Sequence, residues 1–206
     1  MNDTRMAQPR SDFSRFGIPV LFILILAVLA GGAYWAYENY QTKQNQAAST
    51  IYSAVVRQYE QKNTKSARQN AEKLVKEYDG TTYAALAGFY LARMDVDAGQ
   101  PAKAVTRLEA LRKDGLPTGF EPLVALTLAR VHLTLGKPDE ALKDLQGVAP
   151  AQFAAEFEEM RGDAYMAQNK PADARKAYAA ALSKLEEKDP YRAIVQLKLD
   201  DLGGAA

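Results

Sequence analysis

Asn169-Lys-Pro-Ala-Asp-Ala174 has two close copies earlier in the chain, Gly99-Gln-Pro-Ala-Lys-Ala104 and Gly136-Lys-Pro-Asp-Glu-Ala141. Each copy starts with Gly or Asn, which tolerate the left-handed backbone that often ends a helix. A proline follows two residues later, where it suits the first turn of the next helix. The three prolines are 37 and 33 residues apart. A period of this length is typical of stacked helix–turn–helix repeats.

The sequence around these turns repeats as well, with small and large side chains at matching positions. The positions are Gly162, Tyr165, Ala174, Tyr178 and Ala181 in the last repeat, Ala129, His132, Ala141, Leu145 and Val148 before it, and Ala92, Asp95, Ala104, Leu108 and Leu111 before that. The extra residues between the first two prolines fit the loop Gly115-Leu-Pro-Thr-Gly119. A degenerate fourth copy is predicted over residues 51–78, with its turn at Lys62-Asn-Thr-Lys-Ser-Ala67.

After the last repeat, Pro190 opens a final helix that we expect over residues 191–202. A terminal repeat needs a polar outer face, which we expect from Arg192, Lys198, Asp200 and Asp201. Good helix formers dominate the chain beyond residue 38, and no β-branched alternating run of strand length occurs. The predicted fold is therefore all-α, an α-solenoid of about four helix pairs with a C-terminal capping helix.

A stretch of 22 residues without any charge, residues 16–37, precedes the repeats. As a helix it is about 33 Å long, enough to cross a hydrocarbon core of about 30 Å. Tyr34, Trp35, Tyr37 and Tyr40 form an aromatic belt at its far end. We expect a cytoplasmic tail over residues 1–15, a transmembrane helix over 16–37, a polar stalk over 38–48 and a repeat domain over 49–206.

The flanking charges predict the orientation of this helix. Three arginines precede it, Arg5, Arg10 and Arg15, whereas only Lys43 follows it closely. By the positive-inside rule, the tail is cytoplasmic and the remainder of the chain is translocated. The sequence therefore predicts a single-pass type II membrane protein, with the bulk of the chain on the translocated side of the membrane.

A cleaved signal peptide is the alternative, with Ala27, Ala30 and Ala33 as small residues for a peptidase. The apolar stretch is longer than a typical signal core of about 7–15 residues and ends in bulky aromatics, so an uncleaved anchor is favoured. Small residues four apart are typical of faces that contact another membrane helix. The candidates for such a contact are Ala27, Gly31, Gly32 and Ala36.

The composition excludes several classes of function. The 26 Lys and Arg residues nearly balance the 25 Asp and Glu residues, and no basic run attracts nucleic acid. The absence of cysteine rules out a disulfide framework, a thiolate nucleophile and a cysteine zinc site. The only histidine, His132, falls where the repeat needs a core aromatic, so we expect a structural role.

No Ser-x-x-Lys motif or glycine-rich phosphate loop is recognisable. An acidic group lacks the glycine-bearing loop of a calcium site, so we expect a solvated helix face; it comprises Glu156, Glu158, Glu159 and Asp163. The sequence therefore predicts no enzyme activity, no cofactor, no metal site and no small-molecule substrate.

Stacked helix pairs present a curved surface, and the first helix of each pair usually lines its concave side. The register places Leu86, Phe89, Arg93, Val96, Leu123, Leu126, Arg130, Leu133, Glu159, Asp163 and Met166 on that side. These residues combine apolar pockets, an Arg93/Arg130 ladder and an acidic end. Such a surface suits an extended or helical peptide. The alternative is that most of the apolar members are packed core.

The spacing from Gly162 to Ala181 resembles a tetratricopeptide repeat. The basic tail, the anchor ending in Tyr-Trp, the polar stalk and the repeats together resemble the YfgM-like family of ancillary SecYEG translocon subunits. This resemblance, which covers nearly the whole chain, implies a place in the bacterial inner membrane with the bulk of the chain in the periplasm. It also implies association with SecYEG, with a membrane-anchored periplasmic chaperone of the PpiD type, and with exported client proteins.

Two other functions remain open at this point. An envelope assembly or division scaffold would use the same repeats with other protein partners. A secreted hydrolase would have a leader that is cleaved near residue 34.

Overall fold

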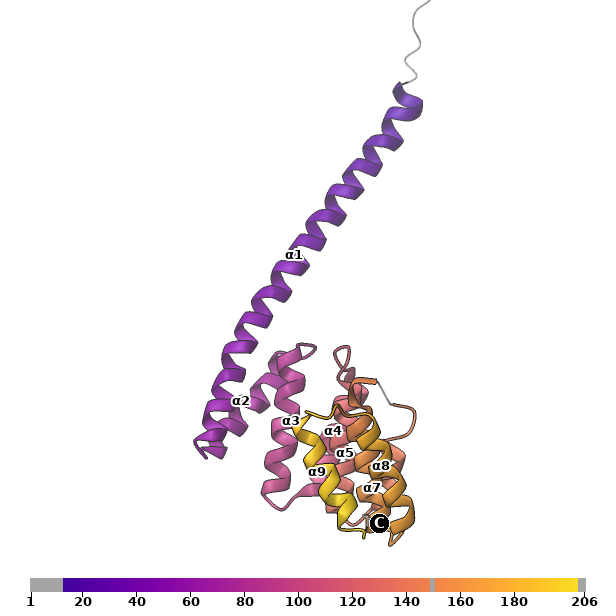
Figure 1. The fold of residues 1–206 in the computed structure, drawn as a ribbon. Helices are drawn as coiled ribbons and strands as arrows, with labels where there is room; N and C mark the ends of the chain where they lie inside the picture. The colour runs from indigo at the N-terminus through magenta and orange to yellow at the C-terminus, as the bar shows by residue number, and fades with distance from the viewer. Residues whose placement is uncertain (1–12, 149–150, 204–206) are drawn as a thin grey trace, which may run out of the picture. The chain divides into compact units, whose positions relative to one another are not determined.

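The structure is a computed structural model that describes residues 13–148 and 151–203. All regular secondary structure in these ranges is helical, which confirms the all-α prediction (Figure 1). The chain divides into two compact units, Met1–Gln46 and Ala47–Ala206. We describe each unit by itself.

The first unit contains most of the long helix α1 (Phe13–Glu60). The large side chains from Leu21 to Leu29 are 49–74% exposed in the chain itself, and by length and composition the helix can cross a membrane. Apart from the neighbouring residues and the backbone of α1 itself, nothing in the described chain lies within 4 Å of a Cβ built on Gly31 or Gly32. Arg5 and Arg10 of the expected cytoplasmic tail lie outside the described residues, as does the side chain of Arg15.

The second unit is a series of helix pairs that starts with the end of α1. The later helices are α2 (Thr64–Glu77), α3 (Thr82–Asp97), α4 (Pro101–Asp114), α5 (Glu121–Thr134), α6 (Pro138–Asp144), the 3-10 turn η1 (Ala151–Phe153), α7 (Ala154–Ala167), α8 (Pro171–Ser183) and α9 (Pro190–Asp200). From α2 onward, each α-helix packs against the next in sequence, and α5 also packs against α7. This nearest-neighbour packing is characteristic of a solenoid.

The repeated turns form as the sequence predicts. Gly99, Gly136 and Asn169 adopt left-handed φ values of 73°, 68° and 56°, and Lys62 adopts 60° in the degenerate copy. A proline begins α4, α6 and α8. The same backbone hydrogen bond closes all three turns. Gln100 N–H donates to the Asp95 carbonyl at 2.8 Å. The equivalent bonds, from Lys137 to His132 and from Lys170 to Tyr165, are 2.9 Å long.

The core lies between successive helices and is built from complementary small and large residues. Tyr178 is 3% exposed, and its ring occupies the space that a Cβ on Gly162 would need. In the two preceding pairs the small residue is Ala92 or Ala129, and the large one is a leucine. Leucine is smaller than tyrosine and leaves room for the alanine methyl group, so the space between the two helices is well packed in each repeat.

The third helix pair departs from the sequence prediction. Helix α6 ends at Asp144, and Gly147 adopts a φ of 74°. Val148 therefore lies outside a helix, although Leu111 and Ala181 at the matching repeat positions are helical. Val148 still packs against the core cluster of this pair.

The prediction that α9 has a polar outer face is wrong for two of its four residues. Arg192 donates to the carbonyls of Leu182 and Leu185, and Lys198 contacts Glu159 and Asp163 of α7. A buried carboxylate needs a paired cation, and this need turns Lys198 inward. Asp200 and Asp201 are exposed as expected, but the apolar Ile194 and Leu197 are 51% and 63% exposed beside them.

Candidate protein-binding groove

The first helices of three consecutive pairs line a common hollow of about 520 Å³. We call it the aromatic groove, and it is lined by Tyr59, Phe89, Tyr90, Ala92, Arg93, Val96, Asp97, Thr127, Arg130, Val131 and Thr134. These residues come from the end of α1, from α3 and from α5. Of the sequence-predicted site residues, the structure brings Phe89, Arg93, Val96 and Arg130 together here.

Aromatic rings from α1 and α3 form one side of the groove. The ring centroids of Tyr59 and Tyr90 are 5.3 Å apart with an interplanar angle of 80°, an edge-to-face contact. Tyr52 continues the row, with its centroid 5.9 Å from that of Tyr90 and 5.7 Å from that of Tyr83. The ring centroids of Phe89 and Phe120 are 6.2 Å apart. Rigid rings of this kind offer apolar area to a partner at little cost in side-chain entropy.

Polar groups at the rim of the groove differ in how they are paired. The hydroxyl of Tyr59 donates to Asp97 Oδ2 at 2.7 Å, and Nε of Arg93 donates to Asp97 Oδ1 at 3.0 Å. Burial and the hydrogen bond to Asp97 raise the pKa of Tyr59, so its hydroxyl stays protonated and donates. Arg130 is exposed and forms no ion pair with any residue that the structure describes. Its guanidinium remains available for a carboxylate or a backbone carbonyl of a partner.

The other predicted apolar residues do not line this groove. Leu126 is 8% exposed and belongs to the core cluster that also contains Met160, and Leu133 packs against the same cluster. Leu86 and Leu123 are partly buried, whereas Met166 of α7 is 40% exposed. Packed core is therefore the correct interpretation for Leu126.

The predicted acidic end of the surface is occupied by the chain itself. Glu159 is 5% exposed and pairs with Lys198, and Asp163 accepts hydrogen bonds from Lys198 Nζ at 2.6 Å and from the Tyr178 hydroxyl at 2.7 Å. Burial, followed by the charge of Glu159, raises the pKa of Tyr191. The interpretation of this group as a solvated helix face is wrong for Glu159. Glu159 and Asp163 hold the capping helix.

His132 lies elsewhere, between α5 and α6. It is 8% exposed, and its Nδ1 is 2.6 Å from Oδ2 of Asp144. This buried contact between two helices of one pair agrees with the structural role that the repeat position indicates.

Tyr59 and Tyr90, the two tyrosines that line the aromatic groove, are missing from the sequence prediction, although a signal was present. Tyr52 and Tyr59 are seven residues apart, as are Tyr83 and Tyr90. Two helical turns separate residues at this spacing, so both pairs lie on single helix faces. The turn of the degenerate first repeat does not by itself fix the register, so the sequence alone does not assign Tyr59 to the same surface as Phe89 and Arg93.

Comparisons with known proteins agree on the fold. The tetratricopeptide repeat-like domain family matches residues 11–204. The chain is 34% identical over 182 residues to a protein of Neisseria gonorrhoeae called ancillary SecYEG translocon subunit, and the match covers 87% of each chain. It is 29% identical over 180 residues to an Escherichia coli protein of the same name, covering 87% of this chain and 85% of the other.

Proposed function

The chain belongs to the YfgM-like family of tetratricopeptide repeat-like proteins, and we propose that it is an ancillary subunit of the Sec translocon that binds other proteins through the aromatic groove. The resemblance seen in the sequence is thereby confirmed at the level of the family. The observation that carries the proposed binding role is the groove itself, which combines exposed aromatic area with the unpaired guanidinium of Arg130. Family and fold point to a non-catalytic subunit.

In this proposal the apolar part of α1 anchors the protein in the inner membrane. Residues 1–15 are cytoplasmic, 16–37 cross the membrane, 38–48 form the stalk, and 49–206 form the periplasmic repeat domain. The arginines that precede the anchor support this orientation.

The chain lacks cysteine, so single introduced cysteines report the topology without background. In intact spheroplasts, a membrane-impermeant maleimide should label Thr64→Cys at once and Thr4→Cys only after lysis. Labelling of Thr4→Cys before lysis would contradict a cytoplasmic tail, and a mature N-terminus near residue 34 would indicate a cleaved leader.

The partners that the family implies are SecYEG, a periplasmic chaperone of the PpiD type and exported client proteins. The groove suits an extended or helical segment of such a partner, because apolar side chains can lie on Phe89 and Tyr90 while Arg130 holds a carboxylate or a carbonyl oxygen. Tethering to the membrane raises the local concentration of the groove near the channel, so weak contacts suffice.

Affinity purification of the full-length chain in mild detergent tests this role. We expect a Sec subunit or a periplasmic chaperone to copurify, and we expect Arg130→Glu combined with Thr134→Trp to reduce recovery at least fivefold. Lys137→Glu is the matched control, since this exposed lysine does not line the groove. Recovery of neither partner would contradict the proposal, and recovery of cell-wall or division proteins instead would favour an envelope scaffold.

The anchor is a second candidate contact within this function. Ala27, Gly31, Gly32 and Ala36 leave space on α1 for another membrane helix. Replacing residues 16–37 by an unrelated transmembrane helix should preserve topology but weaken copurification of the Sec subunit. Unchanged recovery would mean that the repeats alone hold the partner.

A further inference from the structure

A second hollow, of about 430 Å³, lies between α2, α3 and α4, and we call it the basic groove. Small residues of α3 form its floor, Ala84, Ala85 and Gly88, and Val75 of α2 and Leu111 of α4 stand beside them. Gly88 keeps the floor low, because a Cβ there would lie 3.2 Å from the side chain of Leu111. The groove is therefore deep enough to admit an apolar side chain.

The basic groove and the aromatic groove use different faces of α3. Ala84 and Gly88 are four residues apart, and Asp95 follows seven residues after Gly88, so these residues share one helix face. Phe89, Arg93 and Val96 occupy another face and line the aromatic groove. An occupant of one groove consequently does not cover the other.

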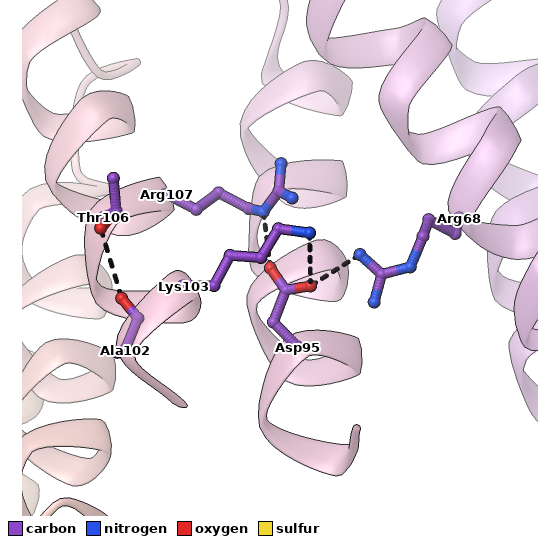
Figure 2. A network of polar contacts seen from close by, with 6 residues as sticks. All are labelled: Arg68, Asp95, Ala102, Lys103, Thr106 and Arg107. Atoms are coloured by element: carbon purple, nitrogen blue, oxygen red, sulfur yellow. Dashed lines mark hydrogen bonds and ion pairs between the residues drawn. The ribbon is translucent and has the colours of Figure 1, made fainter. Parts of the chain in front are cut away.

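The wall of the basic groove contains more positive than negative charge. Asp95 is fully buried and accepts a hydrogen bond from Arg68 Nη1 at 2.6 Å and from Arg107 Nε at 3.0 Å. Lys103 Nζ lies 3.9 Å from the same carboxylate, and its side chain is 55% exposed (Figure 2). Three cations thus share one carboxylate, and this carboxylate is inaccessible to a partner.

The residues that line the groove repeat this excess. They include three cations, Lys76, Lys103 and Arg107, and one anion, Asp79, which gives a net charge of +2. Arg68 and Asp95, which do not line the groove, carry one positive and one negative charge, so including them leaves the net charge at +2. Lys76 is exposed and forms no ion pair with any other described residue.

The corresponding hollow between α4, α5 and α6 provides an internal comparison. Its lining contains four acidic residues, Glu109, Glu121, Glu140 and Asp144, and two basic ones, Arg112 and Lys143, for a net charge of −2 with His132 neutral. We call it the acidic groove. Because both hollows lie between the second helix of one pair and the two helices of the next, the sign of the charge is specific to the basic groove and is not a consequence of the repeat.

We propose that the basic groove binds an acidic segment of a partner protein in which apolar residues alternate with carboxylates. One apolar side chain enters between Val75 and Leu111, and neighbouring carboxylates meet Lys76 of α2 and Lys103 of α4, one on each side. Cations on two helices with an apolar floor between them match such alternation. This site lies outside the aromatic groove and goes beyond the proposed function.

Fluorescence anisotropy with the full-length chain in dodecyl maltoside tests the proposal. The probe is a labelled nonapeptide, acetyl-Ser-Gly-Glu-Leu-Glu-Phe-Glu-Gly-Ser-amide, and its control carries Gln in place of each Glu. We expect saturable binding of the Glu peptide, at least tenfold weaker binding of the Gln peptide, and weakening by 0.5 M salt. Equal binding of both peptides, or binding of neither, would overturn the proposal.

Variants of the protein locate the bound peptide. Lys76→Gln with Lys103→Gln should weaken binding at least tenfold, and Ala110→Phe should block it, since Ala110 is exposed and lines the groove. The matched controls, Lys113→Gln and Ala172→Phe, change exposed residues that do not line the groove and should bind as wild type. Circular dichroism verifies that each variant is folded.

Two further measurements separate the alternatives. Arg130→Glu should leave peptide affinity unchanged, and a loss of affinity would place the peptide in the aromatic groove and contradict the proposal. Added phosphatidylglycerol should not displace the peptide. Displacement that depends on Lys76 and Lys103 would identify an anionic lipid as the occupant and overturn the assignment to a protein segment.

Discussion

The second and third helix pairs each place a polar contact between their two helices, with the acid on the first helix in one pair and on the second helix in the other. In the second pair, the acid Asp95 lies on the first helix and accepts from Arg107 on the second, 12 residues later. In the third pair, His132 lies on the first helix and Asp144 on the second, again 12 residues later and 2.6 Å away. In both pairs this repeat position makes a polar contact between the two helices, but the helix that supplies the acid differs, and in the fourth pair the same position holds Tyr165, which packs against the core. Arg107 lines the basic groove and Asp144 lines the acidic groove, so the choice contributes to the opposite net charges of the two grooves.

The two contacts also differ in how strongly each depends on its partners. The side chain of Asp95 is fully buried and has two arginines, which are 25% and 22% exposed (Figure 2). The side chains of His132 and Asp144 are 11% and 13% exposed and form a single contact. Water can reach His132 or Asp144 of the third pair when its partner is lost, so removal of a residue should cost less there than at Asp95.

The largest expected effect is that of Asp95→Ala. It leaves Arg68 and Arg107 facing each other without a carboxylate, and we expect the free energy of unfolding to fall by about 3 kcal/mol. Urea unfolding of the full-length chain in dodecyl maltoside, followed by circular dichroism, measures it. The matched control is Asp173→Ala, which breaks an exposed pair with Lys176 and should cost less than about 0.5 kcal/mol. Equal losses would show that burial of the carboxylate is unimportant.

The fourth helix pair differs from the two before it in packing, because it combines a glycine with a tyrosine where they combine an alanine with a leucine. Gly162→Ala tests this difference. The new methyl group would overlap the buried ring of Tyr178, so we expect a loss of about 2 kcal/mol in the same unfolding assay. In a Tyr178→Leu background, which reproduces the alanine–leucine contact of the two preceding pairs, the same substitution should cost nothing measurable. An equal cost in both backgrounds would contradict this account of the repeat.

The contacts that the sequence could and could not predict differ in their separation along the chain. The turns were predictable because the left-handed residue and the proline at Asn169 and Pro171 are local signals. The inward orientation of Lys198 was not, because its partners Glu159 and Asp163 lie 39 and 35 residues away. The register placed Arg93 and Arg130 correctly on first helices, but it did not show that Arg93 is paired with Asp97 and that Arg130 is unpaired.

Acid should weaken the second pair specifically. Burial opposes ionisation of Asp95, but hydrogen bonds and positive charge from Arg68 and Arg107 outweigh it, and they lower the pKa of this carboxyl below 3.8. A lowered pKa means that the stabilisation is complete above about pH 4 and is lost as the pH falls through the folded-state pKa.

The difference in unfolding free energy between wild type and Asp95→Asn isolates this effect from the other carboxylates. We expect it to be constant from pH 7 to pH 5 and to shrink below about pH 4, with a slope no steeper than about 1.4 kcal/mol per pH unit. Urea unfolding at several pH values measures it. A difference that stays constant down to pH 2.5 would mean that folding does not lower the pKa of Asp95.

The smallest expected effect comes from removing the polar contact of the third pair altogether. His132→Phe with Asp144→Leu replaces both partners by apolar groups, so no buried donor or acceptor is left unpaired, and the free energy of unfolding should change by less than about 1 kcal/mol. Asp144→Leu alone should cost more than the double substitution, because it leaves the imidazole nitrogen without its acceptor. The equivalent double substitution in the second pair, Asp95→Leu with Arg107→Leu, should lower the free energy of unfolding, because the guanidinium of Arg68 would lose its carboxylate and face apolar side chains. If both double variants lose the same stability, the exchange of the acid between the first and the second helix has no energetic consequence, and its effect is confined to the charge of the two grooves.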